Sequence, residues 1–359
     1  MLRLNMWLLR VILPLSVASI PVVARSQSNV VLYGDFDTGI MYSSRSVDSQ
    51  GESTGHKFSL IDGGEHGSTF GLRGREDLGG GWASIFQLEG GFSPTTGGLA
   101  NSNGNFFGRW AYVGLDGPYG TVKIGLQYSP FVIACILTDP RGADYFGGGS
   151  VVYLDNIFVT GQYNPNAISY TTPRVGGVQG SVMMALGGQA GDFRAGRQYS
   201  AGLSYMQGPL RIDAALYNGQ PNIGAPSQPV PDTVQFVGRV VGLSFDWHKF
   251  TLKAAFTNYK VANSFDTFEY ELGGRYAVSP FMFVDAGVWY MHDQNDGRNH
   301  SILTASGVEY FFSKATSLYS DIAYVNNHGH MNTGVSANGG AFGAPGSTVA
   351  VLIGINKTF

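Results

Sequence analysis

Charge, cysteine and long apolar runs are all scarce in this sequence. Only 13% of its 359 residues are charged, which is about half of the roughly 25% found in an ordinary soluble domain. The single cysteine, Cys135, excludes an intrachain disulfide. Beyond residue 26 no apolar run approaches the roughly 18 residues that a membrane-spanning helix requires. The mean hydropathy is nevertheless +0.00, so the apolar residues are spread along the chain rather than gathered in helices.

Glycine and aromatic residues are abundant instead. The chain has 52 glycines, 23 phenylalanines and 19 tyrosines, a composition typical of many strands joined by tight turns and not of a helical enzyme. Residues 349–359 alternate strictly: the odd-numbered positions are apolar apart from Lys357, and the even-numbered ones are small or polar apart from Leu352. A strand of about 11 residues is long enough to cross the hydrocarbon of a bilayer when it is tilted. Residues 269–278 alternate in the same way, with Glu269 and Glu271 on one face.

The N-terminal segment, residues 1–26, is predicted to be a secretory signal peptide. Arg3 and Arg10 precede an apolar stretch, and small residues follow, so that cleavage fits after Ser26 and nearly as well after Ala24. A transmembrane helix is the alternative, but two prolines interrupt the stretch. Removal of this segment leaves 19 basic and 25 acidic residues, a net charge of −6. Such a chain is not a general nucleic-acid binder.

The connections between the expected strands alternate between short and long. Short turn signals and longer Gly/Asn/Ser-rich segments follow one another along the chain, which makes seven turns and eight loops, enough to join sixteen strands. Strict alternation places all turns at one end of the sheet and all loops at the other, as in outer-membrane barrels. The expected turns lie at 79–81, 117–119, 175–178, 207–209, 247–249, 279–280 and 313–316, and the expected loops at 43–66, 93–107, 128–167, 190–197, 218–233, 260–268, 292–300 and 326–347.

A sheet inside lipid must close on itself, because unpaired backbone groups at an open edge are too costly there. We therefore predict an all-β, 16-stranded antiparallel transmembrane barrel over residues 27–359, in which the last strand pairs with the first. Sixteen strands enclose a lumen too wide for side chains to fill, so water occupies it. Phe359 is expected in the aromatic girdle at the periplasmic interface.

Several stretches resemble the trimeric general porins of the Gram-negative outer membrane, in their β-proteobacterial branch. The most specific is "STFGLRGREDLGGGWASIFQLEGGF" at 68–92, which is similar to the second hairpin of that family over nearly its whole length. The resemblance is dense over residues 27–190 and thin from there to the C-terminal strand. The other matching stretches are "QSNVVLYGDFDTGI" at 27–40, "RWAYVGLDGPYGTVKIGLQYSP" at 109–130, "NAISYTTPRVGGVQGSVMMAL" at 166–186, and the terminal Phe359.

The resemblance implies a third outer loop that folds into the barrel and forms its constriction. Residues 128–167 follow the matching hairpin and are expected to take that role. Their apolar piece, residues 130–137, is interpreted as a short helix or turn packed on the inner wall, with a gating element as the alternative. The sequence departs from the family in two places, with Leu126 where an arginine is common and Arg75 where a neutral residue is common.

Strand parity and the in-folded loop together predict a charged pore lining, with a basic wall opposite an acidic loop. Such a lining orients dipolar solutes and biases ion passage; the alternative is that the residues are solvated and have little individual effect. The candidate constriction residues are Arg73, Arg75, Glu89, Lys123, Asp139, Arg141 and Asp144.

The function implied is an outer-membrane porin, a homotrimer in contact with lipid and lipopolysaccharide, that passes small hydrophilic solutes and ions. A solute-selective channel on the same barrel is the alternative. An enzyme is not expected, because no Ser, His and acid residues converge. No cofactor is expected either. His328 and His330 are spaced as a possible metal pair, but no third ligand is evident.

Overall fold

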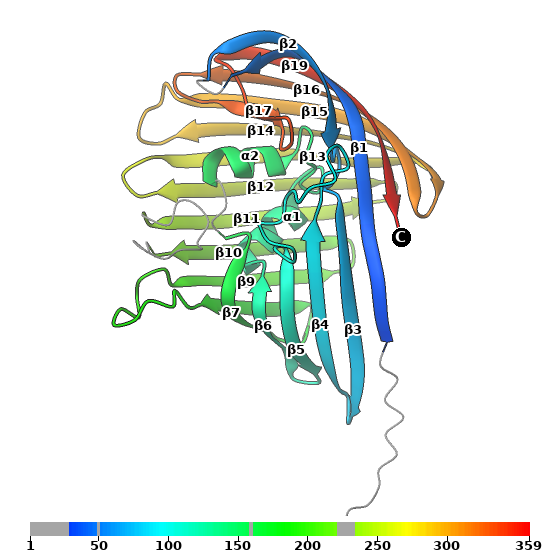
Figure 1. Cartoon of the computed structure of the whole chain (residues 1–359), viewed down its shortest axis with the longest axis vertical. Helices are drawn as coiled ribbons and strands as arrows, with labels where there is room; N and C mark the ends of the chain where they lie inside the picture. Colours follow the sequence, from blue (N-terminus) through cyan, green and yellow to red (C-terminus); the bar gives the residue numbers. More distant parts are fainter. Residues whose placement is uncertain (1–28, 49–50, 158–160, 221–233) are drawn as a thin grey trace, which may run out of the picture.

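The computed structural model describes residues 29–48, 51–157, 161–220 and 234–359 (Figure 1). The expected signal peptide, residues 1–26, lies outside the described residues. None of the described helices is long and apolar enough to cross a membrane.

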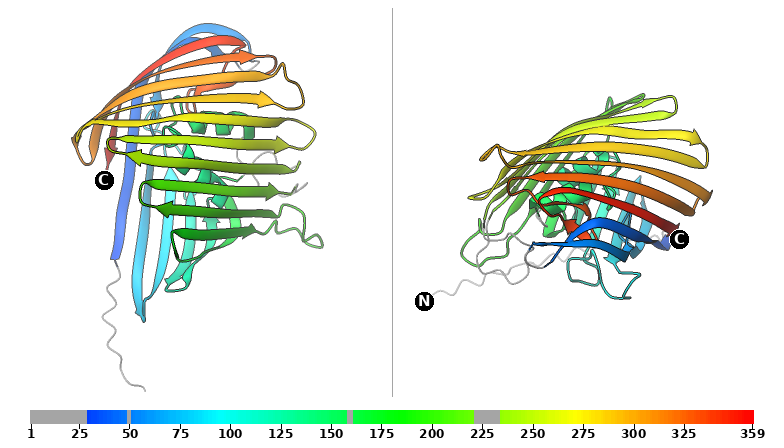
Figure 2. Two further views of the ribbon diagram at one scale, coloured as in Figure 1. Left: turned by 180° about the vertical axis from the view of Figure 1, so that it is seen from behind. Right: turned by 90° about the horizontal axis from the view of Figure 1, so that it is seen from above.

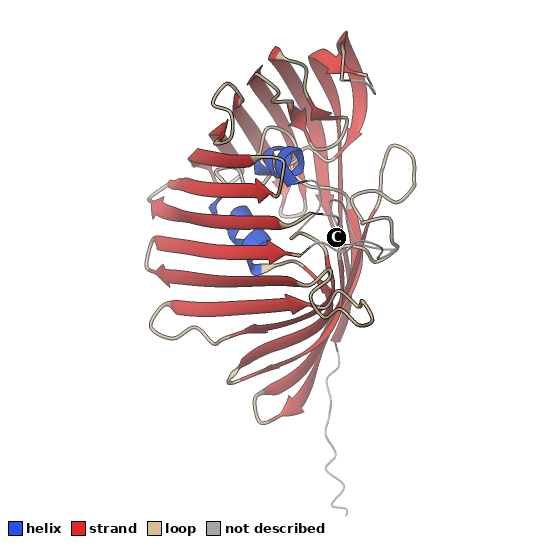
Figure 3. Cartoon of the chain, turned by 90° about the vertical axis from the view of Figure 1, so that its left-hand side faces the viewer, coloured by secondary structure: helices blue, strands red, loops and turns tan. Residues whose placement is uncertain are grey.

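Antiparallel strands form a single sheet that curves round a lumen and holds two short helices inside its curve (Figures 2 and 3). Its strands are β1 (Asn29–Val47), β2 (Ser53–Asp62), β3 (Thr69–Gly79), β4 (Trp82–Gly91), β5 (Trp110–Gly117), β6 (Gly120–Gln127), β7 (Asn164–Thr171), β8 (Val178–Ala185), β9 (Gln198–Gln207), β10 (Leu210–Gly219), β11 (Phe236–Trp247), β12 (Phe250–Val261), β13 (Asp266–Ser279), β14 (Met282–Asp293), β15 (His300–Ser313), β16 (Thr316–His328) and β19 (Gly346–Thr358). A separate hairpin, β17 (Thr333–Ser336) and β18 (Gly340–Phe342), lies in the last loop.

The second strand of the wall is broken into two pieces. Both β2 and β3 pair with β1, the former along residues 38–47 and the latter along residues 29–35. Together they count as one strand of a 16-stranded barrel. The predicted loop at 43–66 was therefore wrong in extent, because β1 continues to Val47 and β2 lies within it. Most of β2 is exposed on both faces, so the alternation that reveals a strand in sequence is missing there.

The barrel closes as predicted, by pairing of its last strand with its first. Residues 35–43 of β1 run antiparallel to residues 350–358 of β19. Beyond this ladder, the amide of Gly34 donates to the carbonyl of Phe359, and the amide of Phe359 donates to the carbonyl of Gly34, each at 3.0 Å. The sheet thus has no free edge along the seam, which is what a wall in lipid requires.

Alternate residues of the strands face opposite environments. On β13, Tyr270 and Leu272 are 50% and 61% exposed, whereas Glu269 and Glu271, which alternate with them, are buried. On β19, Ile353 and Ile355 point outward and Leu352 is fully buried. The predicted period-2 faces are therefore confirmed. Their apolar side is the outer one, which suits contact with lipid.

The seven predicted turns all join neighbouring strands, and most of the loops at the other end are longer. The predicted loop at 260–268 is shorter than expected, since only residues 262–265 separate β12 from β13. Residues 329–345 separate β16 from β19 and include the β17–β18 hairpin. The expected loop at 218–233 lies mostly outside the described residues.

The segment between β6 and β7 folds into the barrel. It contains α1 (Pro130–Thr138), which covers the apolar piece interpreted as a helix or packed turn, and α2 (Gly149–Ile157), which was not predicted. Two apolar clusters hold the segment in place. Phe131 and Val132 of α1 pack with residues of β10–β12, while Val151 and Val152 of α2 pack with residues of β14–β19. The core of this barrel is therefore the contact between the in-folded segment and the inner wall.

Candidate pore constriction

Helix α1 begins where the sequence supplies a cap. The side chain of Ser129 accepts a hydrogen bond from the amide of Val132 at 3.2 Å, and Pro130 occupies the first turn, where its missing amide hydrogen costs nothing. The helix ends at Thr138, whose hydroxyl donates to the carbonyl of Ala134. A nine-residue helix is too short to be stable alone, so its contacts with the wall hold it.

The wall beneath α1 is shaped by two glycines of β11. A Cβ atom added at Gly238 would lie 2.5 Å from Cζ of Phe131, and one added at Gly242 would lie 2.5 Å from Cβ of Thr138. Both distances are far below contact distance for carbon atoms. The missing side chains let the helix lie directly on the sheet, which leaves the rest of the lumen free.

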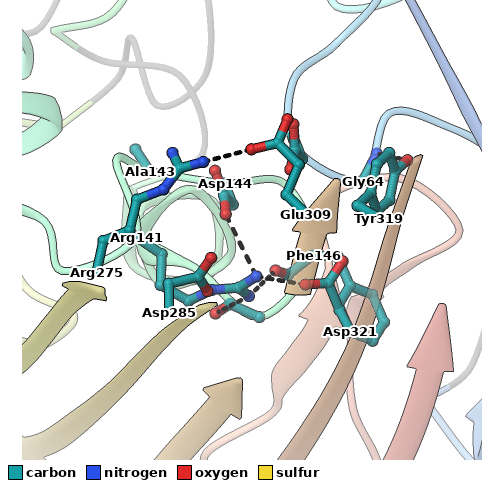
Figure 4. A network of polar contacts seen from close by, with 12 residues as sticks. Gly64, Arg141, Ala143, Asp144, Phe146, Arg275, Asp285, Glu309, Tyr319 and Asp321 are labelled. Carbon is teal, nitrogen blue, oxygen red and sulfur yellow. Dashed lines mark hydrogen bonds and ion pairs between the residues drawn. The ribbon is translucent and has the colours of Figure 1, made fainter. Parts of the chain in front are cut away.

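Arg141, in the turn after α1, fastens the in-folded segment to strands β14 and β16 of the wall (Figure 4). Its guanidinium donates to Asp285 on β14 at 2.5 Å and to Asp321 on β16 at 2.6 Å, and it lies 3.4 Å from Asp144. It also donates to the carbonyl of Phe146 at 2.8 Å. The Arg141 side chain is only 2% exposed. Arg141 therefore anchors the in-folded segment through its ion pairs and hydrogen bonds, and its charge is not exposed to the pore.

The next residues of the segment join two distant parts of the chain. The amide of Phe146 donates to the carbonyl of Gly64, in the break between β2 and β3, and the amide of Gly147 donates to the carbonyl of Val335 on β17. On the Gly64 side, the Tyr319 hydroxyl accepts from the amide of Gly64 and donates to Asp37. The break between β2 and β3 thus leaves backbone groups free to form hydrogen bonds with the in-folded segment.

Asp139 and Asp144 are both buried in this arrangement. The Asp139 carboxylate accepts hydrogen bonds from the indole of Trp289 at 2.9 Å and from the amides of Arg141 and Ala143. Asp144 shares Arg141 with two other carboxylates, and burial raises the pKa of Asp144 well above its usual range. Three carboxylates around one guanidinium cannot all stay ionised at little cost. Burial and the nearby carboxylates therefore both raise the pKa of Asp144, which is the most distant of the three from the guanidinium.

The basic candidate residues on the wall differ in whether a carboxylate neutralises their charge. The guanidinium of Arg73 lies 5.1 Å from the ring centre of Tyr33, and the ammonium of Lys123 lies 4.6 Å from that of Tyr112. Within the described part of the chain neither forms an ion pair. Arg75, by contrast, forms a 2.7 Å ion pair with Asp116.

Glu89 is neutralised as well. It accepts from Arg109 at 2.8 Å and from the Tyr33 hydroxyl at 2.7 Å. The candidate residues are therefore not one cluster. Asp139, Arg141 and Asp144 lie together, while Arg73, Arg75, Glu89 and Lys123 are spread over β3, β4 and β6.

Two cavities lie on opposite sides of α1. The first, of about 260 Å³, contains Lys123 and the Arg211–Asp213 ion pair and is lined on the helix by Ile133 and Leu137; we call it the Lys123 cavity. The second, of about 420 Å³, is bounded by α1, α2, β12, β13 and residues 99–104 and contains Asp139, Glu269 and Glu271; we call it the Glu269 cavity. The helix thus separates an ammonium group from a set of carboxyl groups.

Sequence reasoning missed the partners of the candidate residues. Arg109, Asp285 and Asp321 belong to no local motif, and they were not among the predicted lumen residues. Glu269 and Glu271 were placed together on one face of their strand, but their meeting with Asp139 depends on where the loop folds. Among the described residues no group of three or more His, Cys, Asp or Glu side chains could hold a metal ion.

A closed 16-stranded wall, apolar outside and polar inside, with one loop folded into the lumen, defines a transmembrane channel of the outer-membrane β-barrel class. The chain belongs to the Gram-negative porin family, whose model matches residues 15–330. The protein is thus an outer-membrane channel for passive diffusion, the general function of that family.

Individual relatives agree with this assignment. Outer membrane porin protein 32 of Delftia acidovorans is 28% identical over 97% of this chain and 99% of its own length. An outer membrane porin protein of Bordetella pertussis is 32% identical over a region that covers 53% of this chain and 54% of that relative. The chain therefore matches about half the length of that relative. Among solved structures, the anion-selective porin from Comamonas acidovorans superposes with a TM-score of 0.79 at 25% identity, over 93% of this chain and all of that one.

Proposed function

We propose that the narrowest point of this channel is formed by residues 128–167 and the wall that faces them, and that the channel is a general porin for small hydrophilic solutes and ions. One observation carries the proposal: α1 lies on the inner wall between the Lys123 cavity and the Glu269 cavity. A solute that passes α1 meets positive charge on one side and carboxyl groups on the other. Such a transverse field orients dipolar solutes and biases ion passage.

The candidate residues have different roles in this proposal. Arg73 and Lys123 supply positive charge, because aromatic rings rather than carboxylates hold their charged groups. Arg75 and Glu89 are already neutralised by partners on neighbouring strands. Asp139, Arg141 and Asp144 are positioning residues that fix the in-folded segment, so their effect on current passes through the place of α1.

Planar bilayer recording tests the proposal. Purified folded protein is expected to give current steps that rise in proportion to salt concentration, as a water-filled pore requires. A variant with residues 130–138 replaced by glycine and serine should give larger steps, because α1 no longer occupies the lumen. Steps of unchanged size in that variant, with the barrel folded, would show that the constriction lies elsewhere.

A solute-selective channel is the second candidate function, and the Glu269 cavity favours it. A general pore has no need of a cavity lined by apolar groups and carboxyls, whereas a selective one requires such a site. Liposome swelling with sugars, amino acids and amines of matched size separates the two functions. Equal swelling rates at equal size would leave only the general pore.

The assembly and export of the chain are part of the same proposal. We expect a signal peptide at residues 1–26, a barrel domain at 27–359, a homotrimer, and contact with outer-membrane lipid and lipopolysaccharide. The outward apolar side chains of the strands suit either lipid or a second copy. No chemical reaction is expected. Chemical cross-linking of protein extracted in mild detergent should give a trimer, and a species no larger than a monomer would contradict it.

A further inference from the structure

The Glu269 cavity has the features of a ligand pocket rather than of a packing gap. Its volume of about 420 Å³ lies in the range of roughly 300–1,000 Å³ of small-molecule sites. Much of its lining is apolar or aromatic, including Val132, Ile136, Tyr153 and Tyr259. Side chains of this kind hold the hydrocarbon part of a small solute.

One carboxylate oxygen in this cavity is left without a partner. Glu269 is 1% exposed, and its Oε2 atom has no hydrogen-bond partner among the described residues. A buried polar atom of this kind is costly unless something else satisfies it. The unmatched acceptor therefore points to a donor other than the described residues, such as a bound solute.

The neighbouring carboxyl groups, Asp139 and Glu271, differ in how many hydrogen bonds they accept. Asp139 already accepts three hydrogen bonds, whereas Glu271 accepts one, from the Thr257 hydroxyl at 3.2 Å. Lys253, a basic side chain that interacts with Glu271 and Asp139, donates to the backbone carbonyl of Asp139 and does not line the cavity. The free acceptor capacity is thus concentrated at Glu269 and Glu271.

We propose that the Glu269 cavity binds small amphipathic cations, with the ammonium or amidinium group at Glu269 and Glu271 and the hydrocarbon part against Tyr153 and Tyr259. A cationic donor satisfies the orphaned oxygen and offsets the crowding of three carboxyl groups. Tyrosine faces add attraction for such a cation. This inference rests on the proposed channel function, because the solute enters the cavity from the lumen.

Cys135 provides a built-in reporter. It is the single cysteine of the chain, and it lines the Glu269 cavity from α1. Burial raises the pKa of the Cys135 thiol, so labelling is best followed under alkaline conditions, where more thiolate is present. Modification can be measured by mass spectrometry on folded protein in detergent, independently of any current.

The first arm compares three methanethiosulfonate reagents of similar size: one cationic, one anionic and one neutral. The cationic reagent is expected to modify Cys135 faster than the anionic one by a factor of about ten or more, given local concentration of the charge in an acidic cleft. The double variant Glu269→Gln, Glu271→Gln should remove that preference. Asp296→Asn, in an exposed loop, is the matched control and should keep it.

The second arm uses benzylamine as the probe and benzyl alcohol as its uncharged counterpart. Benzylamine should protect Cys135 from the neutral reagent in the wild type and not in the double variant, whereas benzyl alcohol should protect neither. Equal rates for the three reagents, or no reaction with any, would overturn the cavity as a cation site. Current steps recorded on the same preparations test the channel function separately. Normal current steps without protection of Cys135 would overturn the cation site and leave the channel function standing.

Discussion

Arg141 and Asp321 are 180 residues apart in the chain, yet their side chains meet at 2.6 Å inside the barrel. The ion pair joins the segment after α1 to strand β16, which lies beyond the strands β8–β12 that α1 contacts. Together with Asp285 and the carbonyl of Phe146 it leaves the guanidinium almost fully buried. The position of α1 therefore depends on contacts at both of its sides, the glycines of β11 on one and Arg141 on the other.

Replacement of Arg141 with methionine should destabilise the barrel. The change keeps most of the side-chain volume but leaves Asp144, Asp285 and Asp321 uncompensated, and breaking a buried pair in this way costs about 3–5 kcal/mol. Denaturant unfolding in detergent measures the loss, and noisier single-channel current should accompany it. Arg298→Met removes an ion pair with Asp296 on the surface and should change neither. A stable, quiet Arg141→Met channel would contradict the anchoring role.

Asp144→Asn should alter the pH dependence of stability. Because the pKa of Asp144 is raised by burial, the native state keeps this proton at pH values where the unfolded chain has lost it. The contribution of Asp144 to native stability should therefore fall as pH rises above about 4, the ordinary aspartate pKa, and the variant should lack that component. Unfolding midpoints across the acidic to alkaline range test this directly.

Asp296→Asn is the control of opposite sign for that experiment. Hydrogen bonds from Arg298 lower the pKa of Asp296 to about 2, so any contribution of this group is present above the ordinary aspartate pKa and disappears as pH falls toward 2. A wild-type advantage over Asp144→Asn that grew with rising pH would contradict a raised pKa of Asp144.

Lys123→Gln and Arg73→Gln should each shift ion preference toward cations. Both groups present charge that no described carboxylate neutralises, so the cation-to-anion permeability ratio should rise roughly twofold for each. Arg75→Gln is the matched control on the same strand as Arg73 and should have a smaller effect, because Asp116 already pairs with Arg75. Reversal potentials in a salt gradient give the ratios, and a larger shift for Arg75→Gln would reject this division of roles.

Gly242→Ala should displace α1 from the wall. The added methyl would overlap Thr138, and overpacking of this kind costs about 1–3 kcal/mol. The helix can move only toward the lumen, so current steps should become smaller. Gly180→Ala on β8 is the control, since its Cβ would meet its nearest neighbour, Thr172, at an ordinary 3.7 Å. Unchanged steps in Gly242→Ala would show that α1 does not limit the current.

Alternation and turn chemistry made the barrel wall predictable from sequence. A strand with one apolar face reveals its parity in the chain, as Tyr270 and Leu272 do opposite Glu269. Strand β2 was not predicted because most of it is exposed on both faces, so its sequence carries no such signal. The end of β12 was missed for a related reason, since residues 260–268 contain polar groups that read as a loop.

The interior could be predicted only in part. The apolar piece at 130–137 indicated contact with the wall, and that contact exists. The partners of Arg141 could not be found, because they lie on β14 and β16 and meet it only after the segment has folded inward. The role of Gly238 and Gly242 could not be predicted either, since a glycine in a strand does not indicate that a helix packs on it.

The paired hydrogen bonds between Gly34 and Phe359 bring the first and last strands together although more than 300 residues separate them. Contacts of such long sequence separation slow folding, so the seam should be the last ladder to form, and only after synthesis is complete. Since the two ends meet, a short linker across the seam with new termini opened in the turn at residues 207–209 should give a circularly permuted barrel with the same wall.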